Sequence, residues 1–225
     1  MKIAVAGENA LVIRFGDTIN PDTLAKVRQA VAIIEVELKD YIIDLIPSYA
    51  SLVIVYRQEK IRLSSLRRLL RELLTNPQTA LINSGKRVEL PVYYSTSSGE
   101  DLERVADYQG VTTEEVIDLH SSVEYLVYAI GFAPGFAYLG EVDPALATPR
   151  HSTPRLRVPR GSVAIADRQT AVYPSVSPGG WNLIGRCPTP MFSHQSSPQM
   201  PVSVGDTVVF VPVSKKDFIR LGGTL

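Results

Sequence analysis

The sequence VEYLVYAIGFAPGFAYLG, at positions 123–140, joins an apolar run to a segment rich in bend-forming residues. Its first half, VEYLVYAI, is β-branched and aromatic and ends at a glycine, which favours a strand buried on both faces over a helix. Glycine admits positive φ and proline fixes φ at about −65°, so the second half should hold one bent shape. The bend-forming residues are Gly131, Pro134 and Gly135.

Two interpretations of this bend remain open at the level of sequence. It can be a rigid corner that carries Phe132 or Phe136 to the rim of a barrel, beside an arginine-bearing strand. It can also be a plain barrel corner that is filled by aromatic side chains. The first interpretation makes the segment part of a ligand site, and the second makes it part of the core.

The sequence after Gly140 changes character, because prolines and glycines punctuate short apolar runs. Short strands with turn residues between them predict an all-β barrel or sandwich. The runs are RLRV (155–158), SVAIA (162–166), TAVY (170–173), WNLIG (181–185) and TVVFVPV (207–213). Before the opening stretch, two short helices are predicted: residues 101–110, ended by Gly110, and a second that starts at the capping box of Thr112 and Glu115 and reaches about His120.

The first 90 residues alternate between strand-like and helix-like patterns. Residues 10–15, 42–48 and 51–56 read as strands, and 22–38 and 63–74 as helices. With residues 88–94 as a closing strand, the order predicts a ferredoxin-like βαββαβ unit of the α+β class. We therefore expect a small α+β domain over 1–85 and a mainly-β domain over 86–225.

Composition excludes several classes of protein. The 225 residues are 45% hydrophobic and carry 23 Lys+Arg against 23 Asp+Glu, so no overall field would attract nucleic acid or an anionic membrane. The N-terminus has no apolar core of a signal peptide, and no apolar run approaches the roughly 18 residues of a membrane span. The single cysteine, Cys187, excludes an internal disulfide, is expected to be a buried thiol, and indicates a reducing cytoplasm.

Common cofactor motifs are missing from the sequence. No GxxxxGK[ST], strand-linked GxGxxG or GxSxG pattern occurs, so the chain lacks the common means of holding ATP. The histidines, His120, His151 and His194, lie far apart and share no metal-binding pattern, so no metal site is expected. Near a helix C-terminus, His120 would ordinarily be a favourable dipole partner or a buried, hydrogen-bonded ring.

The segment PRHSTPRLRVPR (149–160) is the strongest candidate for binding an anion. If residues 155–158 are extended, Arg155 and Arg157 project from one face about 6–7 Å apart, while Leu156 and Val158 face the core. Two guanidinium groups at that spacing can bind one carboxylate or phosphate by bidentate hydrogen bonds. The alternative is an exposed basic edge strand that discourages sheet-to-sheet aggregation.

Uncharged groups that suit an amide lie in the next two segments. Gln169 and Tyr173 can donate and accept hydrogen bonds, although both can equally be ordinary hairpin residues. Gly179 and Gly180 form a turn before Trp181, the only tryptophan, which can line a pocket or pack in the core. Secondary candidates for the site are His120, Arg150 and Arg186.

Four motifs in this order resemble the subunit 1 family of allophanate-hydrolase-like proteins. They are VEYLVYAIGFAPGFAYLG, PRHSTPRLRVPRGSVAIADRQTAVYP, SPGGWNLIGRCP and PVSVGDTVVFVPV. The family includes the 5-oxoprolinase subunit PxpB, the kinase inhibitor KipI and a segment of urea carboxylase. The resemblance covers essentially the whole chain and implies a small α+β domain followed by a cyclophilin-like β-barrel.

Residues 119–132 resemble the 5-oxoprolinase members most, which implies one component of a complex with PxpA-like and PxpC-like subunits. Such a complex opens 5-oxoproline to glutamate at the expense of ATP. On this interpretation Arg155 and Arg157 bind the substrate carboxylate, Gln169 and Tyr173 bind its amide, and Phe136 and Trp181 exclude water. The catalytic residues and the chain that binds ATP are not assigned.

Two other functions fit the same family. A KipI-like protein would bind a sensor histidine kinase and inhibit it, and an allophanate-type enzyme would act on a urea-derived amide. The sequence also departs from the family where a segment usually reads AGxQTG, since it has Asp167 and Ala171 in place of glycines. Asp167 can adopt positive φ at modest cost, whereas Ala171 cannot easily take a glycine-only conformation.

Overall fold

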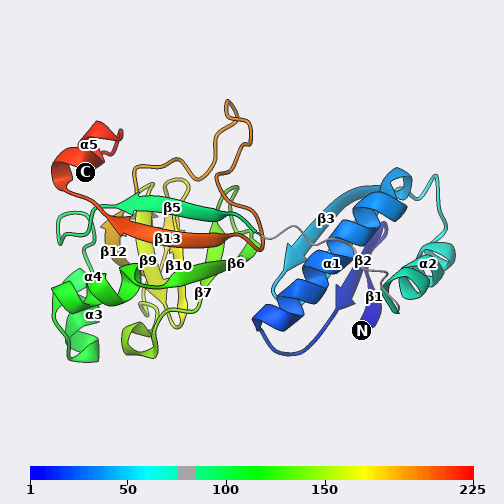
Figure 1. Ribbon diagram of the computed structural model, residues 1–225, viewed down its shortest axis with the longest axis horizontal. Coiled ribbons are helices and arrows are strands. Elements are labelled where there is room, and N and C mark those ends of the chain that lie inside the picture. The colour runs from blue at the N-terminus through cyan, green and yellow to red at the C-terminus, as the bar shows by residue number, and fades with distance from the viewer. Residues whose placement is uncertain (76–84) are drawn as a thin grey trace. The chain divides into compact units, whose positions relative to one another are not determined.

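The computed structural model describes residues 1–75 and 85–225, which form two compact units, Met1–Ser84 and Gly85–Leu225 (Figure 1). Each unit has its own set of buried apolar residues. The end of the first predicted domain, residues 76–84, lies outside the described residues.

The N-terminal unit is an antiparallel sheet with two helices, and its strand order is β1-β2-β4-β3. Asn20 caps the first helix by accepting a hydrogen bond from Thr23 N at 2.8 Å, and Pro21 occupies the first turn, as the sequence predicts. The elements are β1 (Lys2–Gly7), β2 (Ala10–Arg14), α1 (Pro21–Glu37), a 3₁₀ turn (Lys39–Tyr41), β3 (Ile42–Ser48), β4 (Ser51–Tyr56) and α2 (Leu63–Thr75).

The predicted βαββαβ order of this unit is wrong at both of its ends. Strand β1 precedes the predicted first strand, and five of its six residues are exposed, so it lacks the alternation by which a half-buried strand is recognised. The expected closing strand is β5 (Arg87–Val92), which pairs in parallel with β13 (Thr207–Pro212) of the C-terminal unit. A local sequence pattern predicts a strand but does not say which sheet it joins.

The C-terminal unit is built on a large, mainly antiparallel sheet in the order β5-β13-β6-β7-β10-β9-β12. A separate two-stranded sheet pairs β8 with β11. Its strands, besides β5 and β13, are β6 (Glu124–Ile130), β7 (Ala137–Gly140), β8 (Arg155–Val158), β9 (Ser162–Ala166), β10 (Gln169–Val172), β11 (Ser177–Gly179) and β12 (Asn182–Arg186). The helices are α3 (Leu102–Gln109), α4 (Thr113–Ser121) and α5 (Lys215–Arg220), with a 3₁₀ turn at Pro144–Leu146.

The sheet of this unit curls, so its end strands β5 and β12 approach each other (Figure 1). They are joined by one bridge, in which Tyr93 N and Arg186 N each donate to the other residue's carbonyl oxygen at 2.9 Å. A continuous ladder would be needed to close a barrel, and the described strands have none at this seam. The structure therefore establishes a mixed α+β fold with a large sheet. It does not establish the closed barrel that the sequence predicts.

The local predictions for this unit are confirmed at several residues. The run VEYLVYAI is strand β6, and Thr112 and Glu115 form both hydrogen bonds of the capping box. Gly110 ends α3 with φ of 70°, a conformation that glycine adopts without a steric penalty. Cys187 is buried, and burial raises the pKa of its thiol to about 11.

One histidine belongs to the core. The ring of His120 is fully buried, and its Nδ1 lies 2.7 Å from Tyr94 Oη while its Nε2 lies 2.9 Å from Thr170 Oγ1. Burial lowers the pKa of His120 to about 3, so this imidazole is neutral in the folded protein. It is a buried, hydrogen-bonded ring, which is one of its two predicted roles.

The helices can also be compared with the length and hydropathy of a membrane span. Within 1–75 and 85–225, none is both long enough and apolar enough to span a bilayer.

Candidate functional site

A pocket of about 210 Å³ lies in the C-terminal unit, where the loop between β6 and β7 meets the segment before β8 and the turn between β11 and β12. It combines aromatic side chains with two groups that can carry positive charge. Its lining residues are Phe132, Phe136, Tyr138, Arg150, His151, Pro154, Tyr173, Pro178, Gly179, Gly180 and Trp181. Seven of the predicted site residues come together here: Phe132, Phe136, Arg150, Tyr173, Gly179, Gly180 and Trp181.

The apolar wall is centred on the buried ring of Phe136. Its centroid lies 5.3 Å from that of Tyr173 and 5.5 Å from that of Trp181, and both pairs are edge to face. Burial raises the pKa of Tyr173, and the backbone N–H of Trp181 partly offsets this effect. Tyr173 is therefore a neutral hydroxyl near neutral pH and can bind an uncharged amide.

The loop between β6 and β7 has a packing feature of each interpretation of the opening sequence, and its part in a ligand site stays a prediction. Phe136 packs in the core, whereas Phe132 is 66% exposed at the pocket and has φ of 72°, which is unusual for a residue with a side chain. Gly135 has φ of 84°, and a Cβ there would lie 2.4 Å from the carbonyl oxygen of Met191. The bend is thus fixed by close packing, and it carries one ring into the core and one to the rim.

Gly179 gives Tyr173 the space for its hydroxyl. A Cβ at Gly179 would lie 2.2 Å from Tyr173 Oη, so no larger residue fits without moving that ring. Gly180 is less crowded, and its carbonyl accepts a hydrogen bond from His151 N at 2.8 Å. Gly179 thus makes room for a side chain, and Gly180 holds the backbone of His151.

The cation that lines the pocket is Arg150. Its Cζ lies 5.7 Å from the centre of the Trp181 ring, in cation–π range, and its Nε lies 3.9 Å from Asp167 Oδ2. The long contact with an exposed carboxylate is a weak one, so the guanidinium keeps donors for a ligand.

The segment that carries Arg150 is anchored by the backbone on both sides. Thr148 O accepts from Asp167 N at 2.8 Å, and Pro149 O accepts from Nδ2 of the buried Asn182 at 3.0 Å. With the bond from His151 N to Gly180 O, these contacts fix residues 148–151 beside the aromatic wall. Arg150 and His151 are therefore presented by a fixed backbone rather than by a free loop.

Arg155 and Arg157 do not line this pocket. Arg157 is exposed, and Arg155 donates from Nη2 to Asp101 Oδ1 at 2.8 Å, with its Nε 3.5 Å from Glu100 Oε2. The prediction that Leu156 faces the core is wrong, because this side chain is 86% exposed on the narrow β8–β11 sheet. Leu156 and Val158 share one face of β8, but β8 pairs only with β11 among the described strands, and only Val158 is buried.

The remaining predicted site residues lie outside the pocket lining. Gln169 begins β10 and pairs with Gly140 and Ala166, His120 is in the core, and Arg186 is at the seam between β12 and β5. Gly131 and Pro134 shape the loop without lining the pocket.

Sequence reasoning missed His151, Tyr138, Pro154 and Pro178 of the lining, and Asp101 behind it. His151 lines the pocket, and its Nε2 lies 3.0 Å from Oδ1 of the buried Asp101. The two are 50 positions apart, so no local spacing links them. The available signal was a histidine within the basic segment already chosen, together with an aspartate at the start of a predicted helix.

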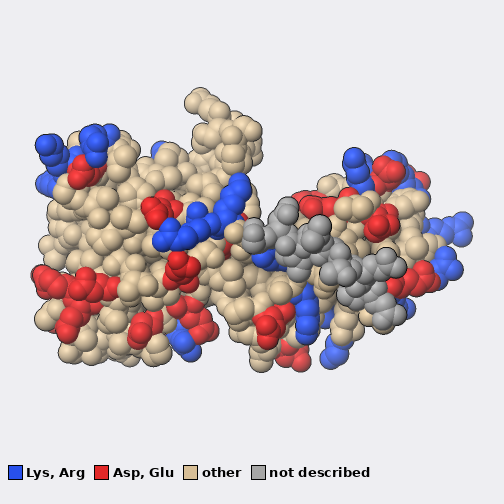
Figure 2. Space-filling model, viewed as in Figure 1, with Lys and Arg blue, Asp and Glu red and all other residues tan. Residues whose placement is uncertain are grey.

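Charge on the surface of the molecule is divided into small areas. Figure 2 shows acidic side chains gathered over α3 and α4 and basic ones at α5 on the visible face. These are Glu103, Asp107, Glu114, Glu115 and Asp118 on the helices α3 and α4, and Lys215, Lys216 and Arg220 on α5. A small anionic substrate would accordingly depend on a cation within its own pocket rather than on a general surface field.

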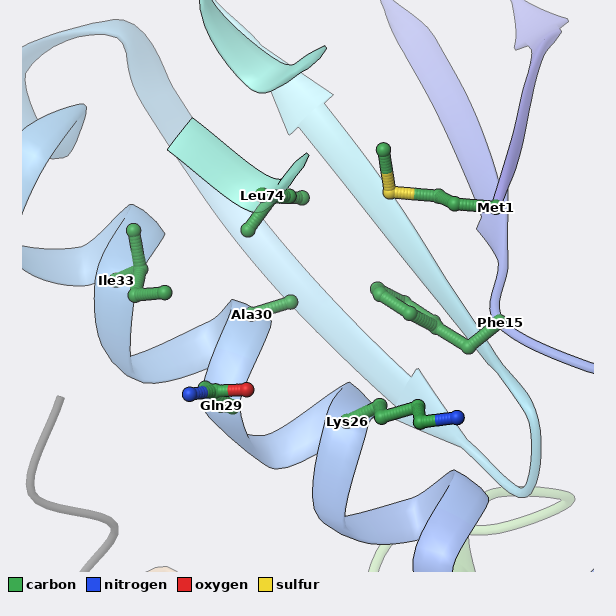
Figure 3. A pocket seen from close by; sticks show the side chains of 7 residues that line it. All are labelled: Met1, Phe15, Lys26, Gln29, Ala30, Ile33 and Leu74. Carbon is green, nitrogen blue, oxygen red and sulfur yellow. The ribbon is translucent and has the colours of Figure 1, made fainter. Parts of the chain in front are cut away.

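A second cavity, of about 280 Å³, lies in the N-terminal unit between α1, α2 and the sheet (Figure 3). Its polar side chains are Lys26 and Gln29, and the others are apolar: Met1, Phe15, Ala30, Ile33 and Leu74. It offers no paired acid and base, which makes the C-terminal pocket the better candidate for chemistry. Within the described ranges, no three acidic, histidine or cysteine residues gather as a metal site would require.

Comparison with known proteins now identifies the family. The family model of the carboxyltransferase domain, subdomain C and D, matches residues 1–202. The chain belongs to this family. It is 39% identical over 227 residues to a 5-oxoprolinase subunit of Bacillus subtilis (strain 168), and the match covers 96% of this chain and 95% of that protein. It is 40% identical over 172 residues to the corresponding 5-oxoprolinase subunit of Escherichia coli O157:H7, covering 76% and 78%.

More distant members of the carboxyltransferase family are part of larger proteins. Urea amidolyase of Saccharomyces cerevisiae is 28% identical over 129 residues, which are 52% of this chain and 7% of that protein. These matches confirm the predicted resemblance to 5-oxoprolinase subunits and to urea-processing enzymes.

Several solved structures share the fold of this chain. TTHA0988 superposes with a TM-score of 0.79 at 36% identity, over 91% of this chain and 40% of that one. PH0987 from Pyrococcus horikoshii gives 0.58 at 40% identity, over 96% and 100%. The Kluyveromyces lactis urea amidolyase, at 18% identity and a TM-score of 0.75 over 97% of this chain and 15% of that one, shows the fold alone.

The two departures from the family pattern have different outcomes in the structure. Asp167 adopts φ of 51°, so the predicted turn with positive φ is confirmed. Ala171 lies in strand β10 and is fully buried beside the pocket wall. It needs no glycine conformation there, and its methyl group packs in the cluster that holds Phe136 and Trp181.

Proposed function

We propose that this chain is the PxpB-like subunit of an ATP-dependent 5-oxoprolinase complex, which opens 5-oxoproline to L-glutamate in the cytoplasm. The observation that carries the proposal is 39% identity to a bacterial 5-oxoprolinase subunit across nearly the whole of both chains. Its partners are then the other subunits of that enzyme, of the PxpA-like and PxpC-like kinds. On this proposal the two units are the predicted α+β and mainly-β domains, and the curled sheet is a relative of a cyclophilin-like barrel.

The pocket has groups suited to each part of this substrate. 5-Oxoproline is a small ring with one carboxylate and one lactam amide. Arg150 is the cation that would bind the carboxylate, Tyr173 the neutral hydroxyl for the amide, and Phe136 and Trp181 the wall that excludes water. Arg150 thus takes the role that sequence reasoning gave to Arg155 and Arg157.

The pocket does not fit ATP. Its glycines pack against Tyr173 or pair with the backbone, and the aromatic wall leaves Arg150 as its one arginine within the described lining. We therefore assign ATP binding to a partner subunit.

Reconstitution of the complex with its partner subunits tests the proposal. The intact complex should convert 5-oxoproline to glutamate and hydrolyse ATP in step with it. Arg150→Ala should raise KM for 5-oxoproline by about 10- to 100-fold, because a charge-assisted hydrogen-bonding partner of the carboxylate is lost. Arg160→Ala, which removes an exposed arginine outside the pocket, is the matched control.

Two outcomes would count against these assignments. A complex without 5-oxoproline-dependent turnover would overturn the proposed function. A normal KM in Arg150→Ala together with a raised KM in Arg157→Ala would show that strand β8 binds the substrate carboxylate, as the sequence predicts.

A urea-derived amide is the second candidate substrate. It is favoured by the identity to urea amidolyase, which is lower and covers about half of this chain. A cationic pocket is less useful for neutral urea than for a carboxylate, so Arg150 argues against urea itself. Allophanate also carries a carboxylate, and 5-oxoproline is preferred over it because the identity to the 5-oxoprolinase subunit is higher and covers more of the chain. Turnover of urea or allophanate by the same complex would reverse this preference.

A further inference from the structure

A buried carboxylate behind the pocket links its histidine to strand β8. Asp101 is 4% exposed and accepts three hydrogen bonds: from Arg155 Nη2 at 2.8 Å, from His151 Nε2 at 3.0 Å and from Leu183 N at 2.7 Å. The residue is also fixed by its own backbone, since Asp101 N donates to Leu183 O at 2.8 Å. Arginine and a backbone N–H can only donate, so Asp101 is the acceptor in these contacts.

This arrangement fixes both the position and the tautomer of His151. Its backbone N–H is bound to Gly180 O, and its ring nitrogen Nε2 faces an acceptor-only carboxylate, so Nε2 carries a proton. The neutral ring then has its lone pair on Nδ1, which makes no hydrogen bond to the part of the chain that is described. The side chain is 22% exposed and borders the pocket, so a ligand or a water molecule can reach it.

We propose that His151 is the proton-transferring residue for opening the lactam, and that Asp101 and Arg155 are its positioning residues. The proposal rests on the proposed function, and it assigns Arg155 to holding a carboxylate of the protein rather than one of the substrate. Nothing else among the pocket-lining side chains pairs a free proton acceptor with a buried carboxylate.

Apart from the ATP that the complex hydrolyses on a partner subunit, the ring-opening step balances with water as the co-reactant. The water oxygen forms a bond to the lactam carbonyl carbon while His151 Nδ1 takes one of the water protons. The bond between that carbon and the ring nitrogen then breaks, its electron pair stays on nitrogen, and the proton held by Nδ1 passes to that nitrogen. The histidine ends unchanged, and the product carries a carboxyl group and a free amine.

Replacement of His151 tests this role in the reconstituted complex. General acid–base catalysis contributes about 100- to 10,000-fold, so His151→Ala should lower kcat for glutamate formation by at least about 100-fold. Added imidazole should restore part of that rate, which a purely structural role would not allow. His194→Ala removes an exposed histidine outside the pocket and should leave the rate unchanged.

A second variant covers the case in which His151→Ala does not fold. His151→Gln keeps a side-chain N–H for Asp101 but has no basic nitrogen, so it should be as slow as His151→Ala while keeping the emission of Trp181. An active wild type with an equally active His151→Gln overturns this assignment alone. A wild-type complex that opens no 5-oxoproline overturns the proposed function and this assignment together.

The positioning residues give a separate readout. Asp101→Asn keeps the size of the side chain but can turn an N–H toward His151 Nε2, which favours the wrong tautomer. For Asp101→Asn we expect kcat to fall about 10-fold or more, with KM for 5-oxoproline little changed. For Arg155→Lys we expect a smaller fall in kcat, because lysine keeps the positive charge. A rise in KM without a change in kcat, in either variant, would show that these residues bind the substrate and would overturn the positioning role.

Discussion

At the scale of single residues, two histidines of the C-terminal unit have different roles. His120 is buried in the core and hydrogen-bonded to Tyr94 and Thr170. His151 borders a pocket, and its Nδ1 makes no hydrogen bond to the described chain. The difference lies in solvent access and in the partner: two neutral hydroxyls for one ring and a carboxylate for the other. Only the second arrangement leaves a nitrogen that can exchange a proton with a ligand.

The buried His120 should make stability depend on pH. Its pKa is lowered by burial to about 3, against about 6.5 in the unfolded chain, so only the unfolded chain binds a proton between these values. Its contribution to stability is therefore complete above pH 6.5 and is lost as pH falls. Urea unfolding at pH 6 and pH 5 should show a loss approaching about 1.4 kcal/mol per pH unit.

The His120→Asn variant identifies the source of that slope. The variant is less stable at every pH, but its free energy of unfolding should change less between pH 6 and pH 5 than that of the wild type. His194→Asn, at an exposed ring, should keep the wild-type slope. Equal slopes in all three proteins would rule out His120 as the group responsible.

At the scale of secondary-structure elements, the loop between β6 and β7 uses an unfavourable backbone conformation at the rim of the pocket. Phe132 has φ of 72°, a conformation that glycine adopts without strain and that is sterically unfavourable for residues with a Cβ. Phe132→Gly should accordingly be more stable than Phe132→Ala by about 1 kcal/mol in chemical unfolding. Both should weaken 5-oxoproline binding to a similar degree, because both lack the ring.

An exposed strand position provides the matched control. Leu156 is exposed on β8, within a strand, so Leu156→Ala should be more stable than Leu156→Gly, which is the opposite order. The same order at both positions would show that the conformation of Phe132 costs nothing.

Most elements could be predicted from the sequence, because their signals are local. The cap at Asn20, the capping box at Thr112 and the alternation in β4 all act within a few residues. What failed depended on distant partners: β5 joins β13, and β8 exposes Leu156 because only β11 accompanies it. The same holds for the site. Its aromatic motifs are local and could be predicted, whereas the contact between Asp101 and His151 joins residues 50 positions apart and could not.

At the scale of the whole molecule, each unit contains its own core. The apolar cluster around Leu11, Ile34 and Ile54 lies within the N-terminal unit, and those around Phe210 and Phe136 lie within the C-terminal unit. Every residue that lines the candidate site lies between Phe132 and Trp181. The proposed chemistry of this chain therefore belongs to one unit.

A fragment of residues 85–225 should consequently fold alone and keep the pocket. About 140 residues are enough to bury a core, and strand β5 takes its partner β13 with it. Trp181 is the only tryptophan and is buried against Phe136, so its emission reports the state of the pocket directly. The fragment should show the same blue-shifted emission as the full chain and one cooperative unfolding transition, whereas emission typical of a solvated indole would show that the aromatic wall depends on the N-terminal unit.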